Sequence, residues 1–296
     1  MTVARHLDRT TTAFLASLVL TEVDASADGR AFDAVPQYVP WPKAYGGDTV
    51  AQLAAAANAT VGDDRRLHSM HSSFLRPVEI GVPVRYEVES VRDGRGYSTR
   101  HVRGIQVGKT VSMCTASYQV PEEGPRRHPG MPDVPAPEEL PSAAEVLAGR
   151  DDDAAVYWGG GRGFDMRHVP SALYTSLVGE TVGAQSVWVR AFSPLPDGAD
   201  LHRLAIAYVC DYTILEPSLR ALGAHWSSPG LTTASLDHSM WFHDDARADD
   251  WLLYVQESAG VQSGRALNTG RFFARDGRLV ASVAQEGLIR LPDASR

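Results

Sequence analysis

The chain has 296 residues, of which 44% are hydrophobic, and a formal net charge of −8. This length allows a substantial core and predicts two domains of ordinary size. The negative charge, without any dense run of Lys and Arg, argues against nucleic acid or an anionic membrane surface as a partner.

The cysteines and the lack of long apolar segments bear on the compartment. Cys114 and Cys210 lie in apolar runs without C-x-x-C spacing, which disfavours a disulfide framework and a zinc site. No apolar stretch reaches the roughly 18 residues of a membrane span, and the N-terminus lacks the apolar core of a signal peptide. The final Ala294-Ser295-Arg296 differs from the peroxisomal Ser-Lys-Leu address. We therefore expect a cytoplasmic protein without a membrane span.

The first half predicts one helix followed by four strands. Asp48–Val61 is rich in Ala and almost free of charge, which is typical of a helix surrounded by protein. The segments after it alternate apolar and polar residues and are joined by turn signals such as Asp93-Gly94. They predict antiparallel strands at Leu67–Leu75, Val82–Val91, Tyr97–Gln106 and Thr110–Gln119.

The middle of the chain predicts connecting structure. Val120–Arg150 is rich in Pro, Glu and Gly, which indicates a long linker covering the outside of the fold. The acidic residues 151–153 predict a solvated turn. The Gly-rich residues 159–163 lack the Lys-Ser/Thr ending of a phosphate-binding loop and predict a flexible connector.

The second half repeats the order of the first. Its helix is predicted at Leu204–Leu215, which is apolar except for Asp211 and Thr213. Asp276-Gly277 is its clearest hairpin signal. Strands are predicted at Thr232–Phe242, Leu252–Ala259, Arg265–Ala274 and Leu279–Arg290.

Matching motifs indicate that the two halves are copies of one domain. His71 corresponds to His238 at an offset of 167 residues, and Tyr86 corresponds to Tyr254 at an offset of 168. A period this long indicates a duplicated domain rather than a solenoid. We expect an α+β fold in which residues 1–120 and 171–296 each wrap a curved antiparallel sheet around a helix, with residues 121–170 as the linker.

Three polar residues of the second half are candidates for catalysis. Asp211 follows a long apolar run, where a carboxylate needs a compensating partner or a function; alternatively, it caps a helix end. In the comparison of the two copies, Ser235 and Gln285 correspond to His68 and Ala116 of the first half. This asymmetry is expected if only the second copy kept a working site, or if the copies drifted apart after duplication. If the helix and both strands converge, the three side chains can hold one water, with Asp211 as its base.

Other polar residues indicate binding or packing rather than a separate chemistry. Gly46-Gly47 precedes the first helix, where backbone N–H groups can polarise a carbonyl, or where a tight helix entry needs small residues. Asp237-His238 resembles half of a serine triad, but the chain has no Gly-x-Ser-x-Gly motif. No spacing matches a metal site, and we interpret the histidines as packing or hydrogen-bonding residues: His68, His71, His238 and His243.

The motifs together resemble the acyl-CoA thioesterase II family over residues 12–290. The resemblance is carried by Tyr45-Gly46-Gly47, by the stretches 68–77 and 236–243, and by Gln285-Glu286-Gly287. It implies a double hotdog fold, hydrolysis of acyl-CoA to free acid and coenzyme A without metal or organic cofactor, and assembly as a homo-oligomer. The family's catalytic set falls on Asp211, Ser235 and Gln285, with Ser at a position where relatives often have Thr.

On this interpretation Asp211 activates water while Ser235 and Gln285 orient it; a covalent route through Ser235 or Asp211 is the alternative. The substrate-binding candidates are Gly46, Gly47, His71, Arg76 and His238. Cations for the coenzyme A phosphates are sought among Arg76, Arg100, Arg103, Lys109 and Arg271. The rival functions are a hotdog hydratase or dehydratase, which needs a paired acid and base, and a non-catalytic acyl-CoA binding protein.

Overall fold

The structure is a computed structural model that describes residues 2–25 and 29–292, with side chains from Thr10 onward. The C-terminal tripeptide considered above as an address lies outside these residues. Within them, no helix is long and apolar enough to cross a membrane.

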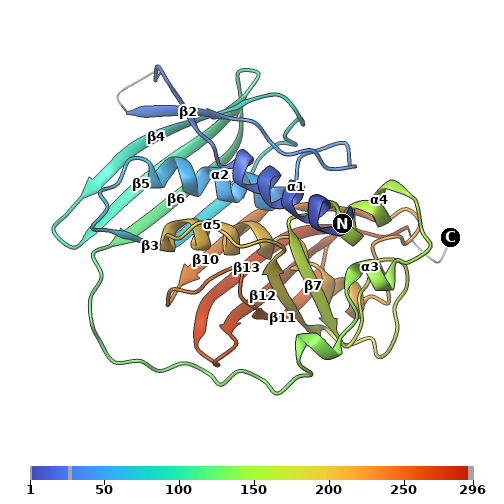
Figure 1. Cartoon of the computed structure of the whole chain (residues 1–296). Helices are drawn as coiled ribbons and strands as arrows, with labels where there is room; N and C mark the ends of the chain where they lie inside the picture. The colour runs from blue at the N-terminus through green and yellow to red at the C-terminus, as the bar shows by residue number, and fades with distance from the viewer. Residues whose placement is uncertain (1, 26–28, 293–296) are drawn as a thin grey trace.

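The first half contains the predicted helix and four strands, preceded by a helix and two short strands that the sequence analysis missed (Figure 1). β2 pairs with β4 and extends the sheet, so the copy has more strands than its alternating segments predicted. The elements are α1 (Thr2–Ser17), β1 (Thr21–Val23), β2 (Arg30–Ala34), α2 (Gly46–Asn58), β3 (Arg66–Phe74), β4 (Val84–Asp93), β5 (Tyr97–Gln106) and β6 (Lys109–Gln119).

The second half has the same plan. Here β7 and β8 precede the helix, and β8 pairs with β11. The elements are β7 (Phe164–Val169), β8 (Ala184–Ala191), α5 (Ala199–Cys210), α6 (Glu216–Ala221), β9 (Thr232–Ser235), β10 (Asp237–Phe242), β11 (Leu252–Gln262), β12 (Arg265–Ala274) and β13 (Leu279–Arg290).

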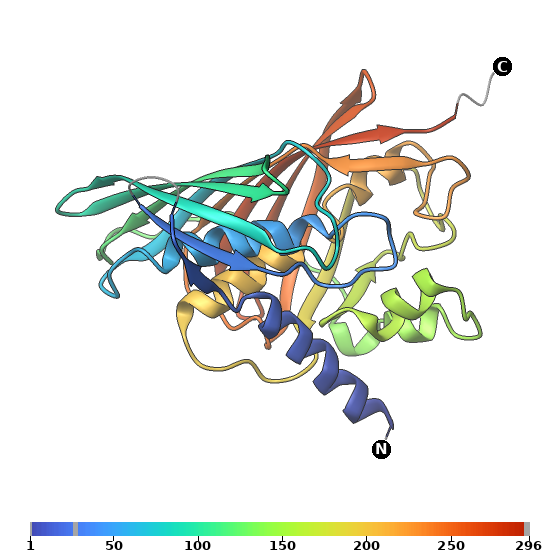
Figure 2. The same ribbon diagram turned by 90° about the horizontal axis from the view of Figure 1, so that it is seen from above.

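One continuous sheet joins the two copies. The strand order is β1-β2-β4-β5-β6-β3-β10-β13-β12-β11-β8-β7, with β9 beside β13. β3 and β10 are the junction and pair antiparallel, with Met70 opposite Met240. α2 and α5 pack against each other on one side of this sheet (Figures 1 and 2). The predicted wrapped sheet around a buried helix is therefore present in both halves.

Small side chains explain why two helices fit side by side under the sheet. α2 is rich in Ala, which favours the helix and allows close approach, and its residues 47–57 are all buried. Val50 and Leu53 of α2 and Ile206 of α5 belong to one core cluster that includes residues of both halves.

The second helix ends earlier than predicted. It spans Ala199–Cys210 instead of Leu204–Leu215, and a turn leads into α6. Pro217 lies in the first turn of α6, where its fixed φ favours the start of a helix. In the interior of a helix continuing from α5, the same residue would break the hydrogen bonding. Asp211 consequently lies at the helix end rather than within the helix.

One predicted strand is divided in two. Thr232–Phe242 forms β9 and β10, separated at Leu236. The Leu236 N–H donates to the carbonyl of Glu286, and its own carbonyl accepts from the N–H of Phe74. The break places β9 against the end of β13, with Ser235 opposite Gly287.

The linker covers the outer face of the second sheet, as predicted, but parts of it are regular. Its apolar residues Met131, Val134 and Leu140 pack on a cluster that contains Trp188 and Phe273. Figure 1 shows the linker as a long trace around the outside before it reaches α3. The short helices are η1 (Pro137–Glu139), α3 (Ala143–Val146), α4 (Asp153–Val156) and η2 (Tyr157–Gly161).

Two predictions for this region need correction. The acidic turn is the start of α4, because the Asp152 side chain accepts from the N–H of Ala155 and caps the helix. The expected connector at 159–163 overlaps η2, a single π-helical turn. β7 lies inside the range 121–170 but pairs with β8, so residues 164–169 belong to the second sheet; the division into two domains itself stays a prediction.

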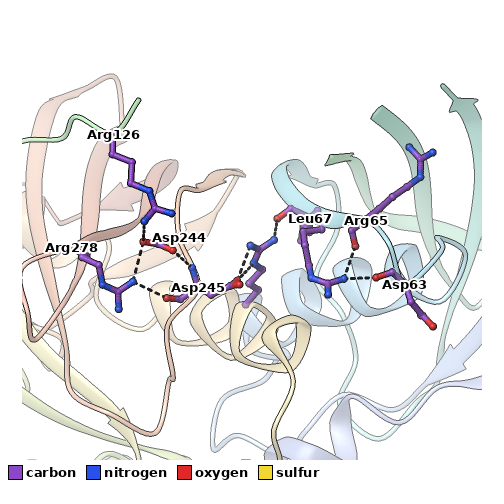
Figure 3. Close-up of polar contacts among 9 residues, drawn as sticks. Asp63, Arg65, Leu67, Arg126, Asp244, Asp245 and Arg278 are labelled. Atoms are coloured by element: carbon purple, nitrogen blue, oxygen red, sulfur yellow. Dashed lines mark hydrogen bonds and ion pairs between the residues drawn. The ribbon is translucent and has the colours of Figure 1, made fainter. Parts of the chain in front are cut away.

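Arginine side chains form hydrogen bonds and ion pairs that connect the two halves and the linker (Figure 3). Arg203 of α5 donates to the carbonyl of Leu67 in β3 at 2.6 Å and to Asp245 at 2.8 Å. Asp244 accepts from Arg278 at 3.0 Å and from Arg126 of the linker at 3.2 Å. The position of α5 relative to the first sheet thus depends on a side chain as well as on the core.

Candidate active site

The three candidate catalytic residues meet at the end of α5. Asp211 follows the last residue of α5, Ser235 ends β9, and Gln285 lies in β13. Asp211 Oδ1 accepts from the Ser235 hydroxyl at 2.8 Å and from the Gln285 amide Nε2 at 2.5 Å. Gln285 Nε2 also donates to Ser235 Oγ at 3.0 Å. We call these three residues the polar trio.

The start of α2 closes the trio from the other half of the chain. The N–H of Gly47 donates to Asp211 Oδ2 at 3.1 Å. A Cβ atom at Gly46 would lie 2.6 Å from the same oxygen, and one at Gly47 would lie 2.1 Å from the carbonyl of Tyr208. Two glycines are therefore needed here because the backbone of α2 touches the carboxylate and the end of α5. The site is assembled from both copies.

The Asp211 carboxylate lies between two helix ends. The N-terminus of α2 carries a partial positive charge that stabilises an anion, whereas the C-terminus of α5 carries a partial negative charge that opposes it. The two effects oppose each other, so the helix dipoles give the carboxylate little net stabilisation. Its position depends instead on the hydrogen bonds from Gln285, Ser235 and Gly47.

His238 orients Gln285 from behind. Its Nδ1 lies 3.0 Å from Gln285 Oε1, and its side chain is completely buried. Since Gln285 Nε2 faces the carboxylate, Oε1 must accept, and Nδ1 of His238 carries the proton. Burial lowers the pKa of His238, which favours this neutral ring. His238, predicted as a substrate-binding residue, thus contacts the amide of Gln285 and is shielded from solvent.

Tyrosines surround the residue that follows Asp211. The ring of Tyr212 stacks on Tyr45, with centroids 4.2 Å apart. The Tyr212 hydroxyl lies 3.1 Å from that of Tyr157 and 3.0 Å from that of Tyr208. Burial raises the pKa of each of these hydroxyls well above its ordinary value, so they remain protonated. This aromatic wall fixes one side of the turn that carries Asp211.

The described residues of the first half do not form an equivalent trio. The residue after α2 is Ala59, whereas the residue after α5 is Asp211. Ala116 of β6 is the counterpart predicted for Gln285. Ser235 pairs with Gly287, two residues after Gln285, and Leu67 pairs with Tyr118, two residues after Ala116. If Ala116 corresponds to Gln285, the counterpart of Ser235 is therefore Leu67 and not the predicted His68. These counterparts are 168 residues apart (235 − 67) instead of the predicted 167, and the bulge at His68 corresponds to the break at Leu236 between β9 and β10.

Other predicted residues lie away from the trio. His71 is exposed, and its Nδ1 lies 3.0 Å from Ser239 Oγ. His71 pairs with Ser239, and the neighbouring pair is Ser72 with His238, which is buried. The two pairs lie on opposite faces of the sheet, because successive residues of a strand point to opposite sides. Arg76 is exposed and donates to the carbonyl of Thr110.

The cations proposed for phosphate differ in their availability. Arg100 is only 3% exposed and is bound by Asp93 and Thr60. Arg103 pairs with Glu87 at 2.7 Å, whereas Lys109 and Arg271 are exposed. A cavity of about 780 Å³ at the start of α5 is also rich in arginine, but each of these arginines pairs with a carboxylate. They are Arg190, Arg247, Arg275 and Arg278.

Lys43 is a candidate that the sequence analysis missed. It is half-buried, and its ammonium donates to the carbonyl of Thr233 at 3.0 Å, two residues before Ser235. Burial lowers the pKa of Lys43, while the charge of Asp211 acts in the opposite direction. Its place shortly before Gly46-Gly47 was the available signal. Among the described residues, no group of His, Cys, Asp and Glu could hold a metal ion.

Comparisons with known proteins agree with this architecture. A family model for the acyl-CoA thioesterase N-terminal domain matches residues 37–119, and one for acyl-CoA thioesterase matches residues 163–288. Acyl-coenzyme A thioesterase 8 from Homo sapiens is 35% identical over 277 residues, which are 86% of this chain and 82% of the relative. Acyl-CoA thioesterase 2 from Haemophilus influenzae is 32% identical, over 90% of this chain and 94% of the relative.

The chain belongs to the acyl-CoA thioesterase II family. An acyl-CoA thioesterase II structure from Mycobacterium marinum is 34% identical and has a TM-score of 0.77. The match covers 95% of this chain and 99% of that one. A protein from Alicyclobacillus acidocaldarius described as having a hot dog fold has a TM-score of 0.75 at 21% identity, over 95% of this chain and 98% of that one. The predicted family and the α+β double hotdog fold are confirmed.

Proposed function

We propose that this chain hydrolyses acyl-CoA thioesters to the free acid and coenzyme A, with Asp211 as a general base acting on water. The activity is supported by the family and by relatives named acyl-CoA thioesterase. The observation that carries the mechanism is the hydrogen bonding of the trio, which leaves the two oxygens of Asp211 in different situations.

The free acceptor capacity lies on Oδ2 of Asp211. Each carboxylate oxygen has two lone pairs. Those of Oδ1 are used by Ser235 and Gln285, whereas Oδ2 receives the N–H of Gly47. One lone pair of Oδ2 therefore remains for a proton of water, and we assign the base to this oxygen.

In the proposed reaction the water oxygen attacks the thioester carbonyl carbon as Oδ2 takes its proton. Ser235 and Gln285 fix the Asp211 carboxylate and orient the water beside it, which reduces the entropic cost of the step. The tetrahedral intermediate then expels coenzyme A thiolate, which takes up the proton from Asp211. A thiolate is a good leaving group, so the step needs no metal.

Lys43 is our candidate for the substrate's anionic part. It is the lysine whose charge interacts with Asp211, and it lies beside β9. Its ammonium can reach a phosphate or polar group of coenzyme A while its stem remains packed. Gly46 and Gly47 would contact the thioester itself, since their backbone lies against Asp211.

The rival functions have less support. A hydratase or dehydratase needs an acid and base beside the acyl carbons. Among the residues that the structure describes, one such pair is buried, with His168 Nε2 3.1 Å from Glu216 Oε2, but both side chains are nearly inaccessible to a ligand. The dehydratase structures that resemble the chain are 15% and 13% identical and indicate only the fold. A non-catalytic binding protein has no reason to retain the complete trio.

Assembly and location remain proposals. β1 and β7 end the sheet, because the inner edges pair with each other through β3 and β10. These outer edges, or the sheet surface, are available for a homo-oligomer of double hotdogs. We also keep the cytoplasm as the proposed location.

The test is the release of coenzyme A thiol from short, medium and long acyl-CoAs, followed with a thiol reagent. Asp211→Asn and Gln285→Ala should lower kcat at least 100-fold. Asp237→Asn makes the same chemical change two residues from Ser235 and should retain activity, because its amide oxygen still accepts from Glu286. Tight binding without thiol release by the wild type would favour the binding-protein alternative.

Ser235→Ala separates the two mechanisms. If Ser235 only orients water, its loss should cost about 10-fold in kcat, because Gln285 and Asp211 remain. If Ser235 is the nucleophile, activity should vanish and the wild type should show a burst of thiol with an acylated serine.

A further inference from the structure

A closed ring of buried hydrogen bonds holds the turn that follows Asp211. Gln256 Nε2 donates to Thr213 Oγ1 at 2.8 Å, and Gln256 Oε1 accepts from Gln185 Nε2 at 2.7 Å. Gln185 Nε2 also donates to Glu216 Oε2 at 2.7 Å, and the backbone N–H of Glu216 returns to the carbonyl of Thr213 at 2.9 Å. The ring therefore begins and ends at Thr213.

We infer that this ring, formed by Thr213, Gln256, Gln185 and Glu216, positions Asp211 for catalysis. The inference rests on the proposed function. No ring side chain has a hydrogen bond to Asp211, Ser235 or Gln285 among the bonds of the described residues, so these are positioning residues.

The ring connects the turn to rigid parts of the second sheet. Gln256 lies in the interior strand β11 and Gln185 in β8, whereas Thr213 and Glu216 belong to the turn and to the start of α6. All four are at most 5% exposed. A buried donor that loses its partner is costly, so each member constrains the others. The turn cannot shift without breaking bonds to the sheet.

Glu216 anchors the ring on its outer side. Its Oε1 accepts from Trp226 Nε1 at 2.8 Å, and its Oε2 lies 3.1 Å from His168 Nε2. Burial alone raises the pKa of Glu216, but the charge of His168 and the hydrogen bonds outweigh it and hold the pKa below its ordinary value. The carboxylate therefore stays charged and remains an acceptor at neutral pH. This also gives the buried His168–Glu216 pair a role that needs no contact with substrate.

Only Tyr212 separates the ring from Asp211, and the tolerance in the position of this carboxylate is small. Thr213 is fixed by the ring and Tyr212 by its stacking on Tyr45, so the backbone of Asp211 is held from its C-terminal side. Oδ1 must accept two side-chain donors at 2.5 and 2.8 Å while Oδ2 meets Gly47. A shift of about 1 Å in the turn disrupts this arrangement, and displacements of that size cost up to roughly 100-fold in rate.

Thr213→Val tests the inference because it removes only the hydroxyl acceptor and keeps the branched shape. We expect kcat to fall about 10-fold with KM within two-fold of wild type. Thr213→Ser restores the hydroxyl and should recover kcat to within about two-fold of wild type. If Thr213→Val does not fold, Gln256→Met removes both ring bonds of that side chain without adding a branch.

Ser218→Ala is the matched control for lost stability. Ser218 is fully buried on α6 and bonds to Ser258 and Asn268, outside the ring. It should lower Tm as much as Thr213→Val but leave kcat unchanged. An unchanged kcat in Thr213→Val, or an equal loss in Ser218→Ala, would overturn the inference while leaving the proposed function intact. A wild type that releases no thiol would overturn the proposed function, and the inference with it.

Discussion

Adding one methyl group at Gly46 should separate activity from stability. Gly46 is the first residue of α2 and its φ is not in the left-handed region, so Ala can adopt this backbone. Its Cβ would lie 2.6 Å from Asp211 Oδ2 and 3.4 Å from Ser235 Oγ. The first distance is far too short, and the carboxylate is the atom group that must move.

The size of the displacement follows from these distances. To pass from 2.6 Å to ordinary contact at 3.4 Å, Oδ2 must move by about 0.8 Å. Such a movement strains the bonds from Gly47, Ser235 and Gln285 together. Displacement of a catalytic group by about 1 Å costs up to roughly 100-fold, so we expect Gly46→Ala to lower kcat by 10- to 100-fold, or about 1.4–2.7 kcal/mol of barrier.

Stability should change little. Ala is favoured over Gly in a helix by roughly 0.5–1 kcal/mol, and this gain offsets much of the cost of lengthening, without losing, three hydrogen bonds worth about 1 kcal/mol each. The free energy of unfolding in urea should therefore remain within about 1 kcal/mol of wild type. Gly47→Ala should behave differently, because its Cβ would meet the carbonyl of Tyr208 at 2.1 Å and force α2 away from α5.

The assay is thiol release at saturating acyl-CoA, paired with urea unfolding of the same preparations. Gly159→Ala is the control, since it adds a methyl group to a helical turn where the nearest atom is 3.6 Å away. It should leave both quantities unchanged. Wild-type kcat in Gly46→Ala would refute the reasoning, because the carboxylate could then move by this distance without consequence.

Three further predictions concern pH, the junction of the halves, and His238. Burial raises the pKa of Asp48 to about 6, so the folded state keeps a proton that the unfolded chain loses near pH 3.9. The contribution of Asp48 to the free energy of unfolding should therefore fall by roughly 3 kcal/mol as pH rises from about 4 to 6, and urea unfolding should show this difference in pH slope between wild type and Asp48→Asn. Arg203→Met should lower the free energy of unfolding by about 2 kcal/mol, because the Leu67 carbonyl loses its donor. Asp245→Asn, which weakens only the exposed pair, should cost less than about 1 kcal/mol; equal losses would contradict this account. His238→Phe should reduce kcat about 10-fold at constant KM, since the Gln285 amide loses its orienting donor, whereas a raised KM would indicate substrate contact.

The repeated pattern, most of the strands and the identity of the trio were readable from the sequence. Alternation of apolar and polar residues is a local property, and so is the Ala-rich composition that predicts α2. The unusual acid after an apolar run singled out Asp211, and its comparison with the other copy added Ser235 and Gln285. The motifs that carry the family resemblance are equally local.

The tertiary structure decided which of these residues meet and which are accessible. The pairing of β3 with β10 joins the copies and places His238 opposite Ser72 and His71 opposite Ser239. Because adjacent pairs point to opposite faces of the sheet, His238 is buried and His71 is exposed. The end of α5 at Cys210, rather than at Leu215, places Asp211 against the start of α2.

Partners across the fold explain the remaining differences. Arg100 looks like a free cation in the sequence, but folding brings Asp93 and Thr60 to it. The ring at Thr213 joins residues from β8, β11 and α6, and their spacing along the chain does not predict these hydrogen bonds. Local sequence determines the period and the chemistry of each element, whereas hydrogen bonds and burial depend on neighbours that only the folded chain supplies.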